Sequence, residues 1–205
     1  MKVGVIDYGI GNIGSVVNMI RHIGANVDVI TEPNKLNYVD KLILPGVGSF
    51  DRGITELRER GFIEPLHECV FQRNIQLLGI CLGMQLLMKS SEEGNLQGLG
   101  WVEGDTKKFN FEGIEKPHRL PHMGWNIVKP THYGSLFKDR NMEYRFYFVH
   151  SYHVMCDEKK DILASAHYGY DFVCALEHNN IFGVQFHPEK SHKFGMELLN
   201  NYLEL

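Results

Sequence analysis

The segment from Gln76 to Gln85 places a cysteine where a nucleophile could act. It begins as an apolar strand, passes through Gly79-Ile80-Cys81-Leu82-Gly83 and continues as an apolar helix. This Gly-x-Cys-x-Gly pattern is that of a nucleophile elbow with sulfur in place of oxygen. The two glycines permit a sharp strand-to-helix turn, and free N–H groups at a helix start favour a thiolate. We therefore expect Cys81 to be exposed at the carboxyl edge of a sheet, ready for acyl transfer.

The same residues also fit a structural role for the cysteine. Free cysteines are often small buried apolar residues, and the glycines could serve only a tight turn. The remaining cysteines, Cys69, Cys156 and Cys174, have no such glycine frame. We expect those three to pack in the core.

A histidine and a glutamate near the C-terminus could complete a catalytic triad. An apolar strand at residues 183–186 runs into His187-Pro188-Glu189. The proline holds His187 extended, and side chains two residues apart in an extended chain point to the same side. His187 could then take the thiol proton while Glu189 orients the imidazole. Alone, the tripeptide better fits a surface histidine beside a solvated glutamate; next to the elbow it predicts a triad.

A glycine-rich loop after the third strand could supply an oxyanion hole. The chain there reads Leu44-Pro45-Gly46-Val47-Gly48-Ser49-Phe50. In α/β hydrolases this loop donates a backbone N–H beside that of the residue after the nucleophile. We expect the donors at Gly46, Val47 and Gly48 and at Leu82. A plain strand-to-helix turn is the alternative.

The first loop contains a second glycine pattern with a different possible meaning. Gly9, Gly11 and Gly14 form a literal Gly-x-Gly-x-x-Gly, and Glu32 could bind a ribose. Such a pattern can bind a dinucleotide, although it is weak in isolation. Asp7 would place a negative charge beside the pyrophosphate, so we expect no dinucleotide here.

The elements that must position these residues alternate in the first half of the chain and are mostly strands in the second. Alternating strands and helices predict a parallel sheet covered on its faces. We expect one α/β domain over residues 1–205, with a mixed sheet. Strands are predicted at 2–7, 27–30, 41–46, 75–80, 100–104, 124–130, 144–154, 162–168, 172–178 and 181–186, and helices at 12–23, between 51 and 72, and at 191–201.

Composition narrows the class of protein. The chain has 205 residues, 43% of them hydrophobic and 22% charged, which is typical of a globular domain. A net charge of −4 and scattered Lys and Arg residues indicate no nucleic-acid partner. The short apolar N-terminal stretch predicts neither a signal peptide nor a membrane span, and hence a cytoplasmic location. No CxxC or HExxH pair suggests a metal.

Taken together, three motifs resemble the class I glutamine amidotransferases. They are GICLGMQ around Cys81, GVQFHPEKS around His187 and LPGVGSF at the third strand. Three further segments, DYGIGNIGSV, LPHMGWN and YFVHSYH, resemble one branch of that family, the glutaminase subunit of imidazole glycerol phosphate synthase in histidine biosynthesis. The resemblance covers nearly the whole chain and implies a flavodoxin-like fold with a Cys-His-Glu triad.

The resemblance also implies a substrate and a partner, and no cofactor. The family's glutaminase hydrolyses L-glutamine to glutamate and ammonia. It passes the ammonia to a separate barrel-shaped cyclase subunit, which makes imidazole glycerol phosphate and aminoimidazole carboxamide ribotide. By matching motif positions, the amino-acid end of glutamine would be held by Gln85, Glu93, Ser151 and Tyr152. The partner would be faced by Asn12, Pro121, His122, Met123, Gly124, Trp125, Tyr147 and Lys190.

Several alternatives stay open at this point. Trp125 could belong to the core, and Lys190 could be a solvated charge. The family's first loop commonly has arginine where this chain has Gly14. A paralogous glutaminase that feeds a surface-sugar amidotransferase would look much the same. A non-catalytic dinucleotide-binding or regulatory module, with a structural Cys81, is the alternative from another class.

Overall fold

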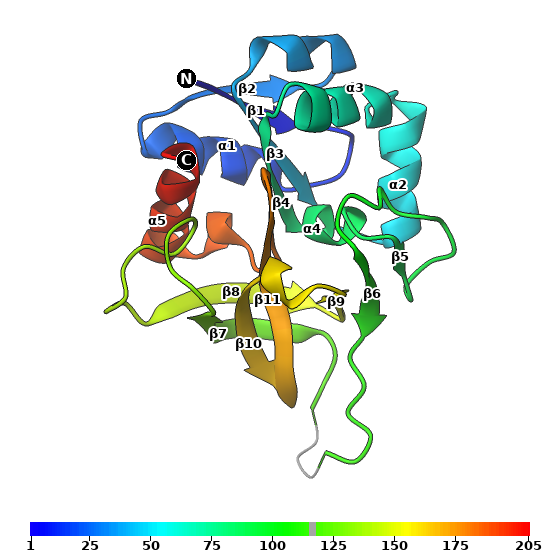
Figure 1. Ribbon diagram of the computed structural model, residues 1–205, viewed down its shortest axis with the longest axis vertical. Helices are drawn as coiled ribbons and strands as arrows, with labels where there is room; N and C mark the ends of the chain where they lie inside the picture. The colour runs from blue at the N-terminus through cyan, green and yellow to red at the C-terminus, as the bar shows by residue number, and fades with distance from the viewer. Residues whose placement is uncertain (115–117) are drawn as a thin grey trace.

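The sheet begins with parallel strands that end at the candidate site. The computed structural model describes residues 1–114 and 118–205. Its parallel strands lie in the order β2 (Asn26–Ile30), β1 (Lys2–Ile6), β3 (Lys41–Gly46), β4 (Gln76–Cys81) and β12 (Ile181–Val184) (Figure 1). In the register of β3 with β4, Gly46 is opposite Cys81. The candidate nucleophile and the glycine loop therefore leave the sheet side by side.

Helices cover both faces of this parallel half. One face carries α1 (Ile13–His22) and α5 (His192–Leu203); the other carries α2 (Phe50–Glu59), α3 (Ile63–His67) and α4 (Leu82–Leu86) (Figure 1). Because both faces are covered, the inner strands are largely apolar, and all of β3 is buried. Val3 and Val5 pack toward α1, whereas Leu42 and Leu44 pack toward α2. Two hydrophobic cores thus hold the sheet from opposite sides.

Shorter helical turns connect these elements. They are η1 (Pro33–Tyr38), η2 (Glu68–Gln72), η3 (Lys159–Asp161) and η4 (Pro188–Lys190). No helix in residues 1–114 and 118–205 is long and apolar enough to cross a membrane.

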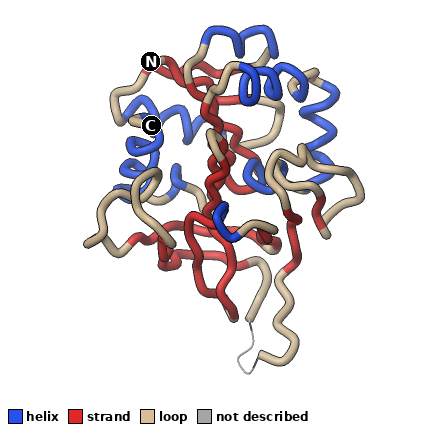
Figure 2. The backbone as a smooth tube through the Cα atoms, in the orientation of Figure 1, coloured by secondary structure: helices blue, strands red, loops and turns tan. Residues whose placement is uncertain are grey.

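The second half of the chain continues the sheet with antiparallel strands. Beside β12 lie β11 (Tyr170–His178), β10 (Ile162–Tyr168), β7 (His122–Pro130) and β8 (Tyr144–His150) in that order. Three further strands branch from this order. β9 (Tyr152–Cys156) pairs with both β11 and β6 (Gly104–Lys108), and β6 also pairs with β5 (Ser90–Ser91). Figure 2 shows the helices gathered around the parallel half, with strands and loops making up most of the rest.

The predicted α/β fold with a mixed sheet is confirmed, and two strand predictions need correction. The strand expected at 100–104 begins only at Gly104, because Trp101 and Val102 instead donate backbone hydrogen bonds to the carbonyl of Leu87 at the end of α4. The strand expected at 144–154 is two strands that meet at Ser151, whose carbonyl accepts a hydrogen bond from the backbone of Phe109.

Candidate active site

Cys81 stands at a strained turn between β4 and α4. Its φ is +55° and its ψ is −112°, a conformation that a residue with a Cβ rarely adopts. The glycines on either side are required by close packing. A Cβ at Gly83 would lie 1.8 Å from the Leu44 carbonyl oxygen, and one at Gly79 would lie 2.8 Å from the Gly83 backbone. The chain therefore makes the turn expected of a nucleophile elbow.

The Cys81 thiol is less exposed than the sequence predicted. Cys81 is only 7% exposed and lines a cavity of about 280 Å³. The prediction that it projects exposed from the sheet edge is wrong, because the loops after β3, β5 and β8 wall the cavity on the substrate side. A substrate must enter this cavity to meet the sulfur.

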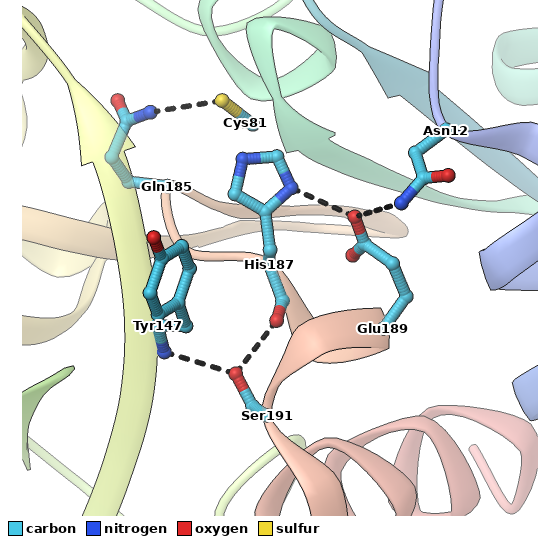
Figure 3. A network of polar contacts seen from close by, with 7 residues as sticks. All are labelled: Asn12, Cys81, Tyr147, Gln185, His187, Glu189 and Ser191. Carbon is cyan, nitrogen blue, oxygen red and sulfur yellow. Dashed lines mark hydrogen bonds and ion pairs between the residues drawn. The ribbon is translucent and has the colours of Figure 1, made fainter. Parts of the chain in front are cut away.

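His187 and Glu189 form a buried pair in the same region. His187 Nδ1 lies 2.8 Å from Glu189 Oε1, and their side chains are 2% and 1% exposed (Figure 3). Asn12 donates through Nδ2 to the same carboxylate oxygen over 3.4 Å. Ser191 donates its hydroxyl to the His187 carbonyl over 2.6 Å and accepts the N–H of Tyr147 over 3.0 Å. These bonds fix the imidazole and its carboxylate to β8 and to the first loop.

Electrostatics favour a charged imidazole beside the cysteine. Burial alone lowers the pKa of His187, but interactions with Cys81 and Glu189 outweigh it and raise that pKa above its ordinary value. Nε2 of His187, the ring nitrogen that is free to serve the substrate, is buried and has no aligned hydrogen-bond partner in the described part of the chain. The cysteine and histidine thus influence each other through both hydrogen bonding and charge, and Nδ1 is the ring nitrogen that faces Glu189.

The residues expected to hold glutamine come together in this cavity. Gln85, Glu93, Ser151 and Tyr152 all line it, although they come from three separate segments. Burial raises the pKa of the Glu93 carboxyl, while the N–H of Phe50, 2.8 Å from its Oε2, opposes that shift. An acid at the wall beside amide and hydroxyl groups suits the ammonium and carboxylate of an amino acid.

The expected oxyanion residues are also close to the sulfur, with one difference. Val47, Gly48 and Leu82 line the cavity, whereas Gly46 is buried beneath it. A Cβ at Gly46 would lie 2.6 Å from the Tyr8 hydroxyl. Gly46 therefore permits close packing, and the loop positions able to face a substrate are Val47 and Gly48. Gly48 has a φ of +113° and open space around it.

Most of the expected partner residues form an exposed surface beside the cavity. Pro121, Met123 and Trp125 are exposed; Gly124 is partly buried between them. Trp125 lies 6.4 Å from the ring of Tyr147, and the Lys190 ammonium lies 5.9 Å from that same ring. Lys190 also lines the cavity. The alternative that Trp125 belongs to the core does not hold, since it is 48% exposed.

Two of the expected partner residues point elsewhere. His122 is 3% exposed because alternation along β7 turns its side chain inward, away from Met123. Asn12 contacts the triad carboxylate, as described above. His122 therefore lies behind the surface that a partner could touch, whereas Asn12 is partly exposed.

Sequence reasoning missed Gln185. Its side chain is fully buried and donates through Nε2 to Cys81 Sγ over 3.7 Å (Figure 3). Its Oε1 accepts a hydrogen bond from Gln85 over 2.9 Å. The only signal in the sequence is its position two residues before His187, on a strand whose other residues are apolar.

The glycine pattern of the first loop serves packing. A Cβ at Gly9 would lie 2.4 Å from the Arg60 guanidinium, and one at Gly11 would lie 3.3 Å from the Pro45 carbonyl oxygen. Gly11 thus lets the first loop pass close to β3, whereas a Cβ at Gly14 would meet no atom within 4 Å. Within residues 1–114 and 118–205, no group of three or more His, Cys, Asp or Glu side chains could hold a metal.

Comparison with known sequences shows the family to which the chain belongs. A family model described as class I glutamine amidotransferase matches residues 4–204. Three relatives are named as subunits of imidazole glycerol phosphate synthase. HisH 2 of Methanococcus maripaludis is 50% identical over 202 residues, covering 98% of each chain. HisH 2 of Pseudomonas aeruginosa is 46% identical over 201 residues, which cover 98% of each chain. HisH of Leptospira borgpetersenii is 42% identical over 203 residues, which cover 99% of this chain and 100% of the relative.

Solved structures of lower identity share the fold. A crystal structure of a glutamine amidotransferase has a TM-score of 0.76 at 19% identity, covering 98% of this chain and 97% of that one. The structure of PurLQS from Thermotoga maritima has a TM-score of 0.77 at 16% identity, covering 99% and 97%. At these identities the likeness concerns the fold alone.

Proposed function

Because the chain belongs to the class I glutamine amidotransferases, and within them to the HisH subunits of imidazole glycerol phosphate synthase, we propose that Cys81, His187 and Glu189 are its catalytic triad. Its function is that of the glutaminase subunit in histidine biosynthesis: it converts L-glutamine into glutamate and ammonia. The family and the activity predicted from the motifs are confirmed. The residue roles below are our proposal.

The first half of the proposed reaction releases ammonia. The Cys81 thiolate attacks the side-chain amide carbon of glutamine, and the carbonyl oxygen becomes an oxyanion. Leu82, Val47 and Gly48 line the cavity, and their backbone N–H groups are the proposed donors to that oxyanion, a contribution typically worth about 3 kcal/mol per donor. The C–N bond then breaks, and His187 gives its proton to the leaving nitrogen. A γ-glutamyl thioester remains on the sulfur.

The second half regenerates the enzyme. Neutral His187 takes a proton from water, which attacks the thioester carbon. The C–S bond breaks, glutamate leaves, and the thiolate and imidazolium are restored. Glu189, 2.8 Å from Nδ1, stabilises the imidazolium and holds the ring in one orientation throughout.

One observation supports this assignment above the others. The strained Cys81, His187 and all four expected glutamine-binding residues line a single cavity of about 280 Å³, although they come from distant parts of the sequence. Glu189 is paired with His187 behind the wall of that cavity. A structural cysteine would have no need of such surroundings.

For the partner, we propose the barrel-shaped cyclase subunit, bound as a heterodimer. Its relatives are named as subunits of a synthase, so a second subunit is part of their function. Lys190 lines the cavity and lies against the Tyr147 ring, which Trp125 also contacts, and Met123 and Trp125 are exposed on β7. A partner docked on this surface would receive ammonia before water protonates it. The free cysteines are consistent with the cytoplasmic location that we also propose.

The test of the triad is the glutaminase rate of Cys81→Ala, measured as glutamate release in the presence of the cyclase partner and its nucleotide substrate. We expect activity to disappear while the circular dichroism spectrum and melting temperature stay close to wild type, because removing one small sulfur at a cavity wall costs little packing. Cys156→Ala, at a half-buried cysteine away from the cavity, is the matched control and should keep full activity. Full activity in the Cys81 variant would overturn the proposal.

A further inference from the structure

A chain of buried side-chain amides connects the glutamine cavity to the sulfur. Gln85 lines the cavity and donates through Nε2 to the carbonyl oxygen of Tyr152, 3.2 Å away, and to Oε1 of Gln185, 2.9 Å away. Gln185 in turn places its Nε2 3.7 Å from Cys81 Sγ. Gln85 is 5% exposed and Gln185 is fully buried.

The orientation of both amides follows from one backbone group. A carbonyl oxygen can only accept, so the atom of Gln85 that faces Tyr152 must be its NH₂. That same NH₂ faces Gln185, so the facing atom of Gln185 must be its oxygen. The NH₂ of Gln185 is then left to point at the sulfur (Figure 3). The reverse orientation would set two N–H groups against each other in the core.

We infer that Gln185 is a positioning residue that holds an N–H donor on Cys81 Sγ and so stabilises the thiolate before glutamine arrives. The inference rests on the proposed role of Cys81 as nucleophile. A thiolate accepts an N–H more strongly than a thiol does, so this donor favours the charged form. The bond weakens once the sulfur becomes a thioester, because the negative charge has left it.

This arrangement divides the work between two donors. His187 Nε2 has no aligned partner in the described residues, which leaves it free to deliver a proton to the leaving nitrogen. Gln185 has no ionisable proton to deliver and can only hold the sulfur. Its contact with Gln85 also connects the sulfur to a residue that we place against the substrate.

The experiment measures alkylation of Cys81 by iodoacetamide at a series of pH values, followed by mass spectrometry of the Cys81 peptide. It compares wild type with Gln185→Met, which has nearly the same length and no N–H. The control is Gln72→Met on an exposed position of η2. In Gln185→Met we expect the alkylation midpoint to rise by about one pH unit, which is a tenfold lower rate below the midpoint. Above it the rate should be unchanged or higher, since a less stabilised thiolate is more nucleophilic.

Two results would overturn the inference. One is a Gln185→Met profile that matches wild type and Gln72→Met. The other is a profile slower at every pH by the same factor, which indicates that the residue only supports the structure. If Cys81→Ala keeps its glutaminase activity, the proposed function fails instead, and the alkylation profile still reports on the N–H donor.

A measurement on the unsubstituted side chain covers the case in which Gln185→Met does not fold. The Gln185 side-chain amide protons in wild type should shift in the NMR spectrum as the pH passes through the alkylation midpoint. In Cys81→Ser they should not, since serine does not ionise in that range. If the chemical shift of these amide protons in wild type did not change over this pH interval, the N–H···S contact would be refuted.

Discussion

The buried polar atoms of the triad are incompletely paired. His187 Nε2 and Glu189 Oε2 have no hydrogen-bond partner within the described residues. An unpaired buried donor or acceptor costs about 1–3 kcal/mol. Such a cost is tolerated where the atom has a task during the reaction, and Nε2 is the atom that must exchange protons with glutamine and water.

At the residue scale we predict that substitutions of His187 and Glu189, the two residues that assist Cys81, reduce the glutaminase rate by different factors. His187→Ala should nearly abolish glutamine hydrolysis, because both proton transfers pass through the imidazole. Glu189→Ala should be about 100-fold less severe, because an orienting carboxylate can be partly bypassed. Steady-state kcat for glutamate release measures both. Equal rates in wild type and His187→Ala would show that another base acts.

Between elements, a pair of histidines joins β7 to β8, and one of them, His150, lines the cavity. His150 Nδ1 lies 2.7 Å from the Tyr152 carbonyl, so it carries the proton and leaves Nε2 as an acceptor. That Nε2 lies 2.9 Å from His122 Nδ1, which must donate; His122 Nε2 then accepts from Asn126 over 3.2 Å. Every ring nitrogen is paired only if both rings are neutral. Burial accordingly lowers the pKa of His122 to about 4 and that of His150 to about 3.

This pair predicts a loss of stability in mild acid. Between the ordinary histidine pKa of 6.5 and the lowered values, the unfolded chain binds protons that the folded chain does not. The free energy of unfolding therefore falls as pH falls, by up to about 1.4 kcal/mol per pH unit for each ring. Urea unfolding from pH 7 to pH 4.5 measures this slope. His122→Gln should make it shallower, whereas His132→Gln, at a half-exposed site, should not; identical slopes in all three proteins would contradict the prediction.

The sequence predicted the strands of the parallel half of the sheet better than those of the antiparallel half. β3 and β4 were predicted because strands buried on both faces appear as continuous apolar runs that end at glycines. In the second half, residues 144–154 contain no glycine or proline to mark a turn, so the break at Ser151 was not visible.

Some residues of the candidate site could be predicted from the sequence and others could not. Cys81 and His187 have local signatures, a glycine frame and a following proline. Gln185 has none, since its importance comes from contacts with Gln85 and Cys81, 100 and 104 residues away. The inward direction of His122 depends on which face of β7 the sheet buries, and the motif that contains it does not reveal that.

At the scale of the whole molecule, a glutaminase that feeds a partner should have only a low rate alone. Ammonia released into water is protonated and loses its nucleophilic lone pair. Val47, 41% exposed beside the unconfined Gly48, could hold the oxyanion donors out of place until a partner docks. We predict a low basal rate that rises when the cyclase partner is added together with its nucleotide substrate. Trp125→Ala and Lys190→Ala should reduce this activation more than the basal rate.

The matching control is a substitution on the far side of the sheet. Tyr38→Ala, exposed in η1, should leave activation unchanged. A high basal rate unaffected by any cyclase would contradict the coupling while leaving the triad intact. Activation by a surface-sugar amidotransferase alone would identify a different ammonia acceptor.

The central claim is that Cys81 forms a covalent bond to glutamine, and trapping that bond tests it most directly. Wild-type protein would be mixed with glutamine and the cyclase partner, quenched in acid during turnover, digested and analysed by mass spectrometry. We predict a γ-glutamyl group on the peptide that contains Cys81, and on none that contains Cys69, Cys156 or Cys174. Turnover without any adduct on Cys81, or with an adduct on another residue, would contradict the account.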